Sequence, residues 1–184
     1  MLRVYRNSWI AGLWIYGVRI ADRVGVSFPG TPIAPNKRLD VGYPVRRMVS
    51  APRDPDAVSA ARQAARESLG IPMGAKVVFA FGGSQGARTI NRLMVDVLPV
   101  LLADPDVYVI HGTGKRLRGN SYDGMSDVQS RTTQVDGLPE DWEKRVIRKD
   151  FFHDMGTYYA ASDVVVCRAG AGSLNEVCAY GVAA

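Results

Sequence analysis

The sequence predicts an α/β fold, a Rossmann-like parallel β-sheet with helices on both faces. Apolar, strand-like runs alternate with helix-like runs along most of the chain, which is typical of parallel strands joined by crossover helices. Two turns rich in small residues, 82–87 and 168–173, each stand between an apolar run and the start of a helix-like run. Because ligands of such folds lie at the carboxyl ends of the strands, both turns are expected at one ligand-binding edge.

The expected elements follow in chain order. Residues 9–22 are expected to be helical, and 24–28 and 39–43 to be extended. Asp54-Pro55 places a capping residue before a proline, so we expect a helix that runs from here to Leu69-Gly70. Further strands are expected at 76–81, 107–111, 146–150 and 163–167, further helices at 88–103, 139–145, 153–161 and 173–180, and a polar stretch at 112–137.

The proline-rich, basic connector 29–53 indicates a domain junction, and we divide the chain into 1–47 and 48–184. The sequence opens on a helix with no preceding strand. It stops directly after a helix, where a further strand is expected. We therefore expect the chain to be a segment of a longer protein, with the second domain incomplete at its C-terminus.

The charge of the chain is unevenly distributed. The 184 residues are 47% apolar and 22% charged, as in a globular protein, and carry a formal net charge of +5. The excess lies in residues 1–50, with eight Lys and Arg against two Asp. This basic segment also holds Trp9 and Trp14, which allows either contact with an anionic membrane surface or a solvated helix face with an aromatic core stripe. No RNA-binding signature accompanies it, so no nucleic-acid partner is expected. The apolar run 9–18 is too short to span a bilayer.

Neither the cysteines nor the acidic residues predict a metal site. Cys167 and Cys178 lack metal-ligand spacing, and we expect buried free thiols in a reducing, cytoplasmic compartment. The segments Asp54-Pro55-Asp56 and Asp104-Pro105-Asp106 match an Asp-x-Asp metal pattern, but both fall at helix boundaries. We therefore expect no metal and no cofactor.

The two small-residue turns predict a nucleotide-diphosphate site. Gly82-Gly83-Ser84-Gln85-Gly86 matches neither the dinucleotide pattern nor the P-loop. Glycines before a helix nevertheless let a phosphate approach free N–H groups and the positive end of the helix dipole. The alternative is a tight turn with no ligand. Glu176, expected in the first turn of the helix after 168–173, would accept two ribose hydroxyls or interact with the helix dipole.

The two histidines carry weaker signals. His111 ends a strand and is expected to face the cleft, and His153 opens a helix. Neither has an obvious carboxylate partner except Asp154 beside His153, and adjacent helix positions diverge. A lining or capping role is therefore expected in preference to catalysis.

Four motifs in register resemble the MurG-type N-acetylglucosaminyltransferases of bacterial peptidoglycan synthesis, in glycosyltransferase family 28. They are Gly-Tyr-Pro-Val-Arg at 42–46, Gly-Gly-Ser-Gln-Gly-Ala-Arg at 82–88 with Asn91, Phe-Phe-His-Asp-Met at 151–155, and Ala-Ser-Asp-Val-Val-Val-Cys-Arg-Ala-Gly-Ala at 161–171 with Glu176. The resemblance implies a two-domain GT-B fold. Residues 1–47 would end the acceptor domain, and 48–184 would form most of the domain that binds the sugar nucleotide.

The resemblance also implies residues for the donor, UDP-GlcNAc. Arg46 would lie at the interdomain cleft, Ser84 would contact the donor, and the amides of Gly83 and Gln85 would lie near the diphosphate. Phe152 stands where the family has an aliphatic residue whose backbone meets the uracil edge. The diphosphate and sugar would be lined by Ala171, Gly172, Ser173, Leu174 and Asn175, and the ribose would be held by Glu176.

The implied reaction is inverting transfer of GlcNAc to a lipid-linked muramoyl-pentapeptide, at the cytoplasmic face of the cell membrane. The family's acceptor-side glycine-rich loop and its histidine are absent here, and its sugar-recognition glutamine motif lies beyond Ala184. The isolated chain is therefore expected to be inactive. The alternatives are a UDP-GlcNAc-binding subunit that needs a partner chain, or a sugar-nucleotide epimerase of the same fold, against which the 82–88 motif speaks.

Overall fold

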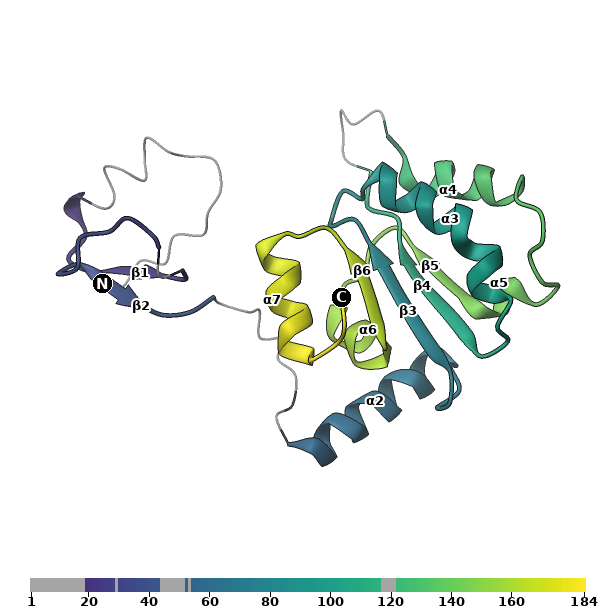
Figure 1. The fold of residues 1–184 in the computed structure, drawn as a ribbon, viewed down its shortest axis with the longest axis horizontal. Coiled ribbons are helices and arrows are strands. Elements are labelled where there is room, and N and C mark those ends of the chain that lie inside the picture. Colours follow the sequence, from purple (N-terminus) through teal and green to yellow (C-terminus); the bar gives the residue numbers. More distant parts are fainter. Residues whose placement is uncertain (1–18, 29, 44–51, 53, 117–121) are drawn as a thin grey trace. The chain divides into compact units, whose positions relative to one another are not determined.

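The computed structural model describes residues 19–28, 30–43, 52, 54–116 and 122–184 (Figure 1). The chain divides into two compact units, Met1–Val45 and Arg46–Ala184. In the first unit, β1 (Val24–Val26) pairs in parallel with β2 (Arg38–Asp40). A small core of Val24, Val26 and Ile33 stabilises this pair. The expected helix 9–22 falls largely outside the described residues, as do the apolar run 9–18 and Arg46.

The second unit is a parallel four-stranded sheet with helical connections. Its strands are β3 (Lys76–Phe81), β4 (Val107–Gly112), β5 (Val146–Lys149) and β6 (Val164–Cys167). Its helices are α2 (Pro55–Leu69), α3 (Arg88–Leu102), α4 (Gly124–Thr132), α5 (Trp142–Arg145), α6 (Met155–Ala161) and α7 (Ala171–Tyr180). None of the helices in the described ranges is long and apolar enough to cross a membrane.

The strand order β5-β4-β3-β6 places a topological switch point between β3 and β6. The chain moves outward from β3 to β4 and β5, and then returns to add β6 on the other side of β3 (Figure 1). In open parallel sheets, ligands bind outside the carboxyl ends of the strands at such a point.

Alternating residues of β3 pack on opposite faces of the sheet, which confirms the predicted two-sided cover. Ala80 belongs to a core with Met94 and Leu98 of α3. On the other face, the ring centroids of Phe79 and of Tyr159 in α6 are 5.7 Å apart. The two-residue period of a strand therefore fixes which helix each side chain meets.

Three local expectations were wrong. Residues 124–132, expected within a polar stretch, form α4. Its sequence has weak helix propensity, but Asp123 caps it by accepting from the Ser126 N–H, and Val128 is fully buried. Helix α6 begins at Met155, so His153 precedes it. Helix α7 begins at Ala171, because the small residues assigned to the turn form its first helical turn.

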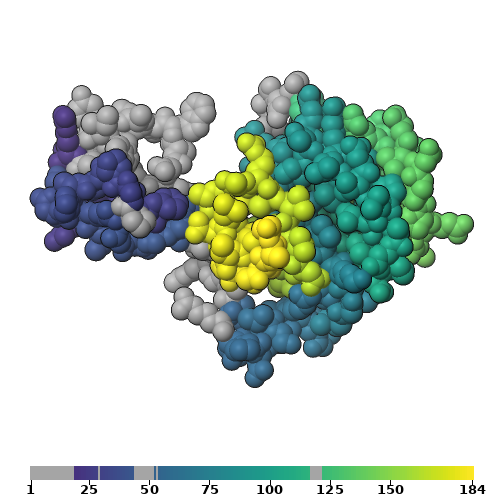
Figure 2. Space-filling model, viewed as in Figure 1, coloured from purple at the N-terminus to yellow at the C-terminus, as the bar shows by residue number. Residues whose placement is uncertain are grey.

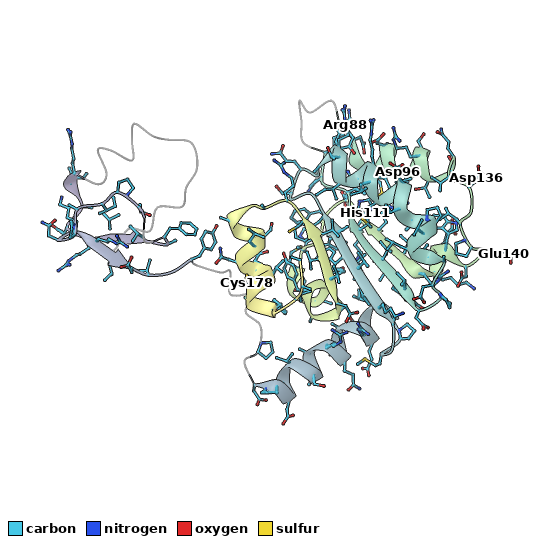
Figure 3. All side chains as sticks on the ribbon, in the orientation of Figure 1. Arg88, Asp96, His111, Asp136, Glu140 and Cys178 are labelled. Carbon is cyan, nitrogen blue, oxygen red and sulfur yellow. The ribbon has the colours of Figure 1, made fainter. Side chains whose placement is uncertain are left out.

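The cysteines are free, as predicted, but they are not buried: Cys167 is half-buried and Cys178 is exposed. Cys178 lies on the outer face of α7 (Figure 3). Partial burial raises the pKa of the Cys167 thiol.

Candidate functional site

The predicted ligand-binding edge contains the loops that follow β3 and β6. Because these strands are parallel neighbours, with Phe81 opposite Cys167, the segments 82–87 and 168–170 leave the same edge of the sheet side by side. Figure 2 shows the residues of α7 at the surface beside the segment that contains β3 and α3. The structure thus brings both glycine-rich turns together at the switch point.

The helices that open from these loops have uncapped N-termini. Helix α3 follows Ala87, and α7 follows Gly170; neither receives a side-chain cap from the described residues, and neither has an acidic residue in its first turn. By contrast, Asp54 caps α2 and Asp123 caps α4 through hydrogen bonds of 3.0 and 3.1 Å. The first-turn N–H groups of α3 and α7 have no carbonyl acceptor within their helices. Together with the positive dipole ends, these groups favour an anion.

The glycine-rich loop presents one side to solvent and packs with the other. Gly83, Ser84 and Gln85 are exposed, and the Gly86 N–H donates to the Gly83 carbonyl at 2.9 Å to close the turn. Gly83 has a φ of 93° and an open space where a side chain would stand. At Gly86, with a φ of 75°, a Cβ would lie 2.1 Å from the Thr113 carbonyl oxygen. Gly83 therefore leaves the solvent-facing side of the loop open, and the lack of a side chain at Gly86 lets the other side pack closely against Thr113.

The second turn presents the beginning of α7. Ala171 and Leu174 are exposed, whereas Gly172, Ser173 and Asn175 are half-buried. The Asn175 side-chain amide donates to the Ala171 carbonyl at 2.8 Å. The exposed start of α7 thus faces solvent at the same edge as 82–87.

Glu176 is the sixth residue of α7, so the expectation that it lies in the first turn was wrong. The helix begins two residues earlier than its sequence indicated. Glu176 is only 6% exposed, and its carboxylate accepts a hydrogen bond from the Tyr159 hydroxyl at 3.1 Å. Contact with a dipole in the first turn is therefore not its role, and its orientation is fixed from α6.

The side chain of Phe152 belongs to the core. It is 6% exposed. The centroid of its ring lies 4.1 Å from the ring centroid of Tyr158 and 5.5 Å from that of Phe79, which it meets edge to face. A Cβ at Gly112 would stand 3.0 Å from this ring. The glycine at the end of β4 thus makes room for an aromatic side chain that is held in the core.

The expectation that His111 faces the cleft was wrong. It is 2% exposed and lies inside the unit (Figure 3), with Nε2 3.1 Å from the Asn91 Oδ1. The side chain points to the face of the sheet that α3 covers, since its register partner Ala80 belongs to the core formed with α3. Burial, together with the charge of Arg148, lowers the pKa of His111 to about 4. His153 is exposed and lies before α6.

Sequence reasoning assigned no role to Asn91, although it is fully buried below the glycine-rich loop. Its amide nitrogen donates to the Thr113 carbonyl at 2.8 Å and to the Tyr122 hydroxyl at 2.9 Å. Tyr122 in turn donates to Asp127 at 3.2 Å. The sequence signal that could have identified Asn91 is a polar residue at a helix position that the helical periodicity of the apolar residues assigns to the core.

A separate hollow at the amino ends of the strands is lined by Arg62, Asp163 and Tyr180, among others. Its charges are already paired, since Asp163 forms ion pairs with Arg62 and with the fully buried Arg66. In the Asp-x-Asp segments, Asp54 caps α2 and Asp104 pairs with Lys76. Among the described residues, no group of His, Cys, Asp and Glu is arranged to hold a metal ion.

Comparison with known proteins agrees with this geometry. Residues 77–184 match the glycosyltransferase family 28 C-terminal domain. The UDP-N-acetylglucosamine--N-acetylmuramyl-(pentapeptide) pyrophosphoryl-undecaprenol N-acetylglucosamine transferase of Desulforudis audaxviator is 31% identical over 89% of this chain and 40% of its own length. The same enzyme of a Nocardioides species is 36% identical over 91% of this chain and 40% of its own length. The chain thus spans about 40% of the length of these relatives.

Solved structures share the fold. MurG of Acinetobacter baumannii superposes with a TM-score of 0.53 at 23% identity, over 89% of this chain and 38% of that protein. WaaG, a glycosyltransferase of lipopolysaccharide biosynthesis, superposes with a TM-score of 0.55 at 12% identity, over 87% of this chain and 42% of that protein. These likenesses support the GT-B architecture, and the match over residues 77–184 establishes the family. The chain belongs to glycosyltransferase family 28.

Proposed function

We propose that this chain binds UDP-GlcNAc and forms the donor-binding part of an inverting N-acetylglucosaminyltransferase of peptidoglycan synthesis. The observation that carries the proposal is the pair of uncapped helix N-termini on neighbouring strands at the switch point. One alone would be a weak anion site. Two that converge on the same edge suit the two phosphates of a nucleotide diphosphate. The relatives named above are transferases, so neither the epimerase nor the separate binding subunit is favoured.

The two segments at this edge would contact different parts of the ligand. The backbone amides of Gly83 and Gln85 and the side chain of Ser84 face the diphosphate from one loop. The start of α7, from Ala171 to Asn175, faces the diphosphate and the sugar from the other. In the transfer step an acceptor hydroxyl attacks the anomeric carbon while UDP departs, so N–H groups aimed at the diphosphate stabilise the charge that develops on it.

The nucleoside end is assigned to Phe152 and Glu176. The Phe152 backbone would meet the uracil edge, since its side chain is held in the core. The Glu176 carboxylate, oriented by Tyr159, would accept the ribose hydroxyls. Arg46, outside the described residues, would approach the donor from the junction between the domains.

The rest of the assembly follows from the same proposal. Residues 1–47 would end the acceptor domain, and 48–184 would form the donor domain. The acceptor is a lipid-linked muramoyl-pentapeptide, so the enzyme would act peripherally at the cytoplasmic face of the membrane. There the basic N-terminal part would meet the anionic surface. The chain alone is expected to give no turnover.

A double comparison of ligand and variant tests the assignment. Calorimetric titration is carried out with UDP-GlcNAc, UDP and 2′-deoxy-UDP on the 184-residue chain, on Glu176→Gln and on the exposed-site control Glu140→Gln. We expect Glu176→Gln to lower the affinity for UDP about tenfold, equivalent to one charged hydrogen bond. The affinity for 2′-deoxy-UDP, which keeps only one of the two ribose hydroxyls, should fall less. Glu140→Gln should bind like the unmutated chain. The assignment would be contradicted if the folded, unmutated chain did not bind UDP. It would also be contradicted if Glu176→Gln lost as much affinity for 2′-deoxy-UDP as for UDP.

A further inference from the structure

We propose that Asn91 is a positioning residue for the diphosphate site, acting from below through the carbonyl of Thr113. The inference rests on the proposed function, because it concerns how the glycine-rich loop is held for its ligand. Asn91 is fully buried and lies four residues beyond Ala87, the residue that precedes α3. It therefore acts through other groups.

The side chain of Asn91 has a single orientation that satisfies its neighbours. The Tyr122 hydroxyl donates to the Asp127 carboxylate, so it must accept from Asn91, and the amide nitrogen is the end that faces it. The same nitrogen donates to the Thr113 carbonyl at 2.8 Å. The amide oxygen is then left to accept from the Nε2–H of neutral His111 at 3.1 Å. Three partners thus hold the amide in place.

The carbonyl that Asn91 holds lies directly against the glycine-rich loop. Cβ atoms built at Gly86 and Gly124 would stand 2.1 and 2.3 Å from the Thr113 oxygen, and one built at Gly114 would stand 2.0 Å from the Gly86 nitrogen. Backbone from three segments therefore meets at this point with no room for a side chain. One residue further on, the Lys115 N–H donates to the Ser84 carbonyl at 2.9 Å.

Asn91 also holds the N-terminus of α3, the helix that follows the glycine-rich loop. The backbone N–H of Asn91 donates to the Ala87 carbonyl at 2.9 Å, which is the first hydrogen bond of α3. Through its backbone Asn91 sets the start of α3, and through its side chain it sets the support on which 82–87 rests. A shift of the Thr113 carbonyl would displace Gly86 and Ser84 and misalign the N–H groups offered to a phosphate.

The test separates the diphosphate from the nucleoside. UDP is titrated calorimetrically, and uridine by NMR shift titration, on the 184-residue chain and on Asn91→Ala. We expect UDP to bind about tenfold more weakly to the variant, the equivalent of one charge-assisted hydrogen bond, and uridine to bind with unchanged affinity. The amide signals of Gly83 and Ser84 should also move in the unliganded variant.

Two further variants keep the inference open to refutation. A Cβ at Gly124 would stand 2.3 Å from the Thr113 carbonyl oxygen and 2.7 Å from the Asn91 amide nitrogen, so Gly124→Ala disturbs the same contact from α4 while Asn91 itself is kept. It should reproduce the selective loss of UDP, and it decides the question if Asn91→Ala does not fold. Thr132→Val removes another buried hydrogen bond, from the hydroxyl to the Val128 carbonyl at 2.7 Å, and should leave UDP affinity unchanged. An equal loss of affinity for UDP and for uridine, or no loss of UDP affinity in a folded variant, would overturn this inference but not the proposed function. Failure of the unmutated chain to bind UDP would overturn the proposed function and this inference with it.

Discussion

The buried imidazole of His111 makes the stability of this protein depend on pH between about pH 8 and pH 5. Burial and the nearby Arg148 charge lower its pKa to about 4, from 6.5 for a solvated histidine. The unfolded chain therefore binds this proton more tightly than the folded one. The stability contributed by neutral His111 is complete above pH 6.5 and is lost as the pH falls toward the folded-state value.

The size of the effect follows from the two pKa values. Between pH 8 and pH 5 the unfolded state takes up most of a proton at this site, while the folded state takes up about a tenth of one. Linkage converts this difference into a loss of about 2 kcal/mol in the free energy of unfolding. His111 is only 2% exposed, so solvent screening does not reduce this value.

Urea unfolding at pH 8 and pH 5 measures this loss. His111→Gln keeps an N–H donor for Asn91 but cannot titrate, so its loss between the two pH values should be smaller than that of the unmutated chain by about 2 kcal/mol. His153→Gln changes an exposed histidine and should keep the full loss. Equal pH dependence for the unmutated chain and His111→Gln would refute the buried, neutral state of His111.

Three further predictions concern stability and binding. Arg66→Met should lower the free energy of unfolding by about 2–5 kcal/mol in urea titrations, because it leaves the buried Ala161 and Ala75 carbonyls without the donor that Arg66 supplies; a loss below 1 kcal/mol would contradict this. Gly86→Ala forces a side chain into a positive-φ position 2.1 Å from the Thr113 carbonyl, so it should both destabilise the protein and abolish UDP binding in calorimetry; unchanged binding would show that the loop can shift freely. Asp54→Ala removes the cap of α2 and should cost about 1 kcal/mol with UDP affinity unchanged, and any loss of affinity would show that the two ends of the sheet are coupled.

The strands and most helices could be predicted because their signals are local. A run such as 76–81 between turn residues indicates a buried strand, and Asp54-Pro55 indicates a helix start, whatever the rest of the chain does. Helix α4 could not be predicted in this way. Its helicity depends on one cap and on tertiary contacts of Val128, against a sequence that favours a polar loop.

The candidate site was predictable in its position but not in its support. The two turns and their meeting at one edge follow from the alternation of strands and helices. The inward direction of His111, the clamp of Asn91 on Thr113 and the anchoring of Glu176 by Tyr159 depend on contacts between segments far apart in the chain. Only the three-dimensional structure assigns these partners.

The proposed function requires that the two uncapped helix N-termini at the β3–β6 switch point bind the diphosphate of UDP-GlcNAc. The most direct measurement is an NMR titration of the 184-residue chain with UDP-GlcNAc, following the backbone amides. We expect the largest shifts on the amides of residues 83–90 and 171–173, and little change at the opposite edge of the sheet around Asp163. Saturable binding with its largest shifts at that opposite edge, or no shifts in a folded sample, would contradict it.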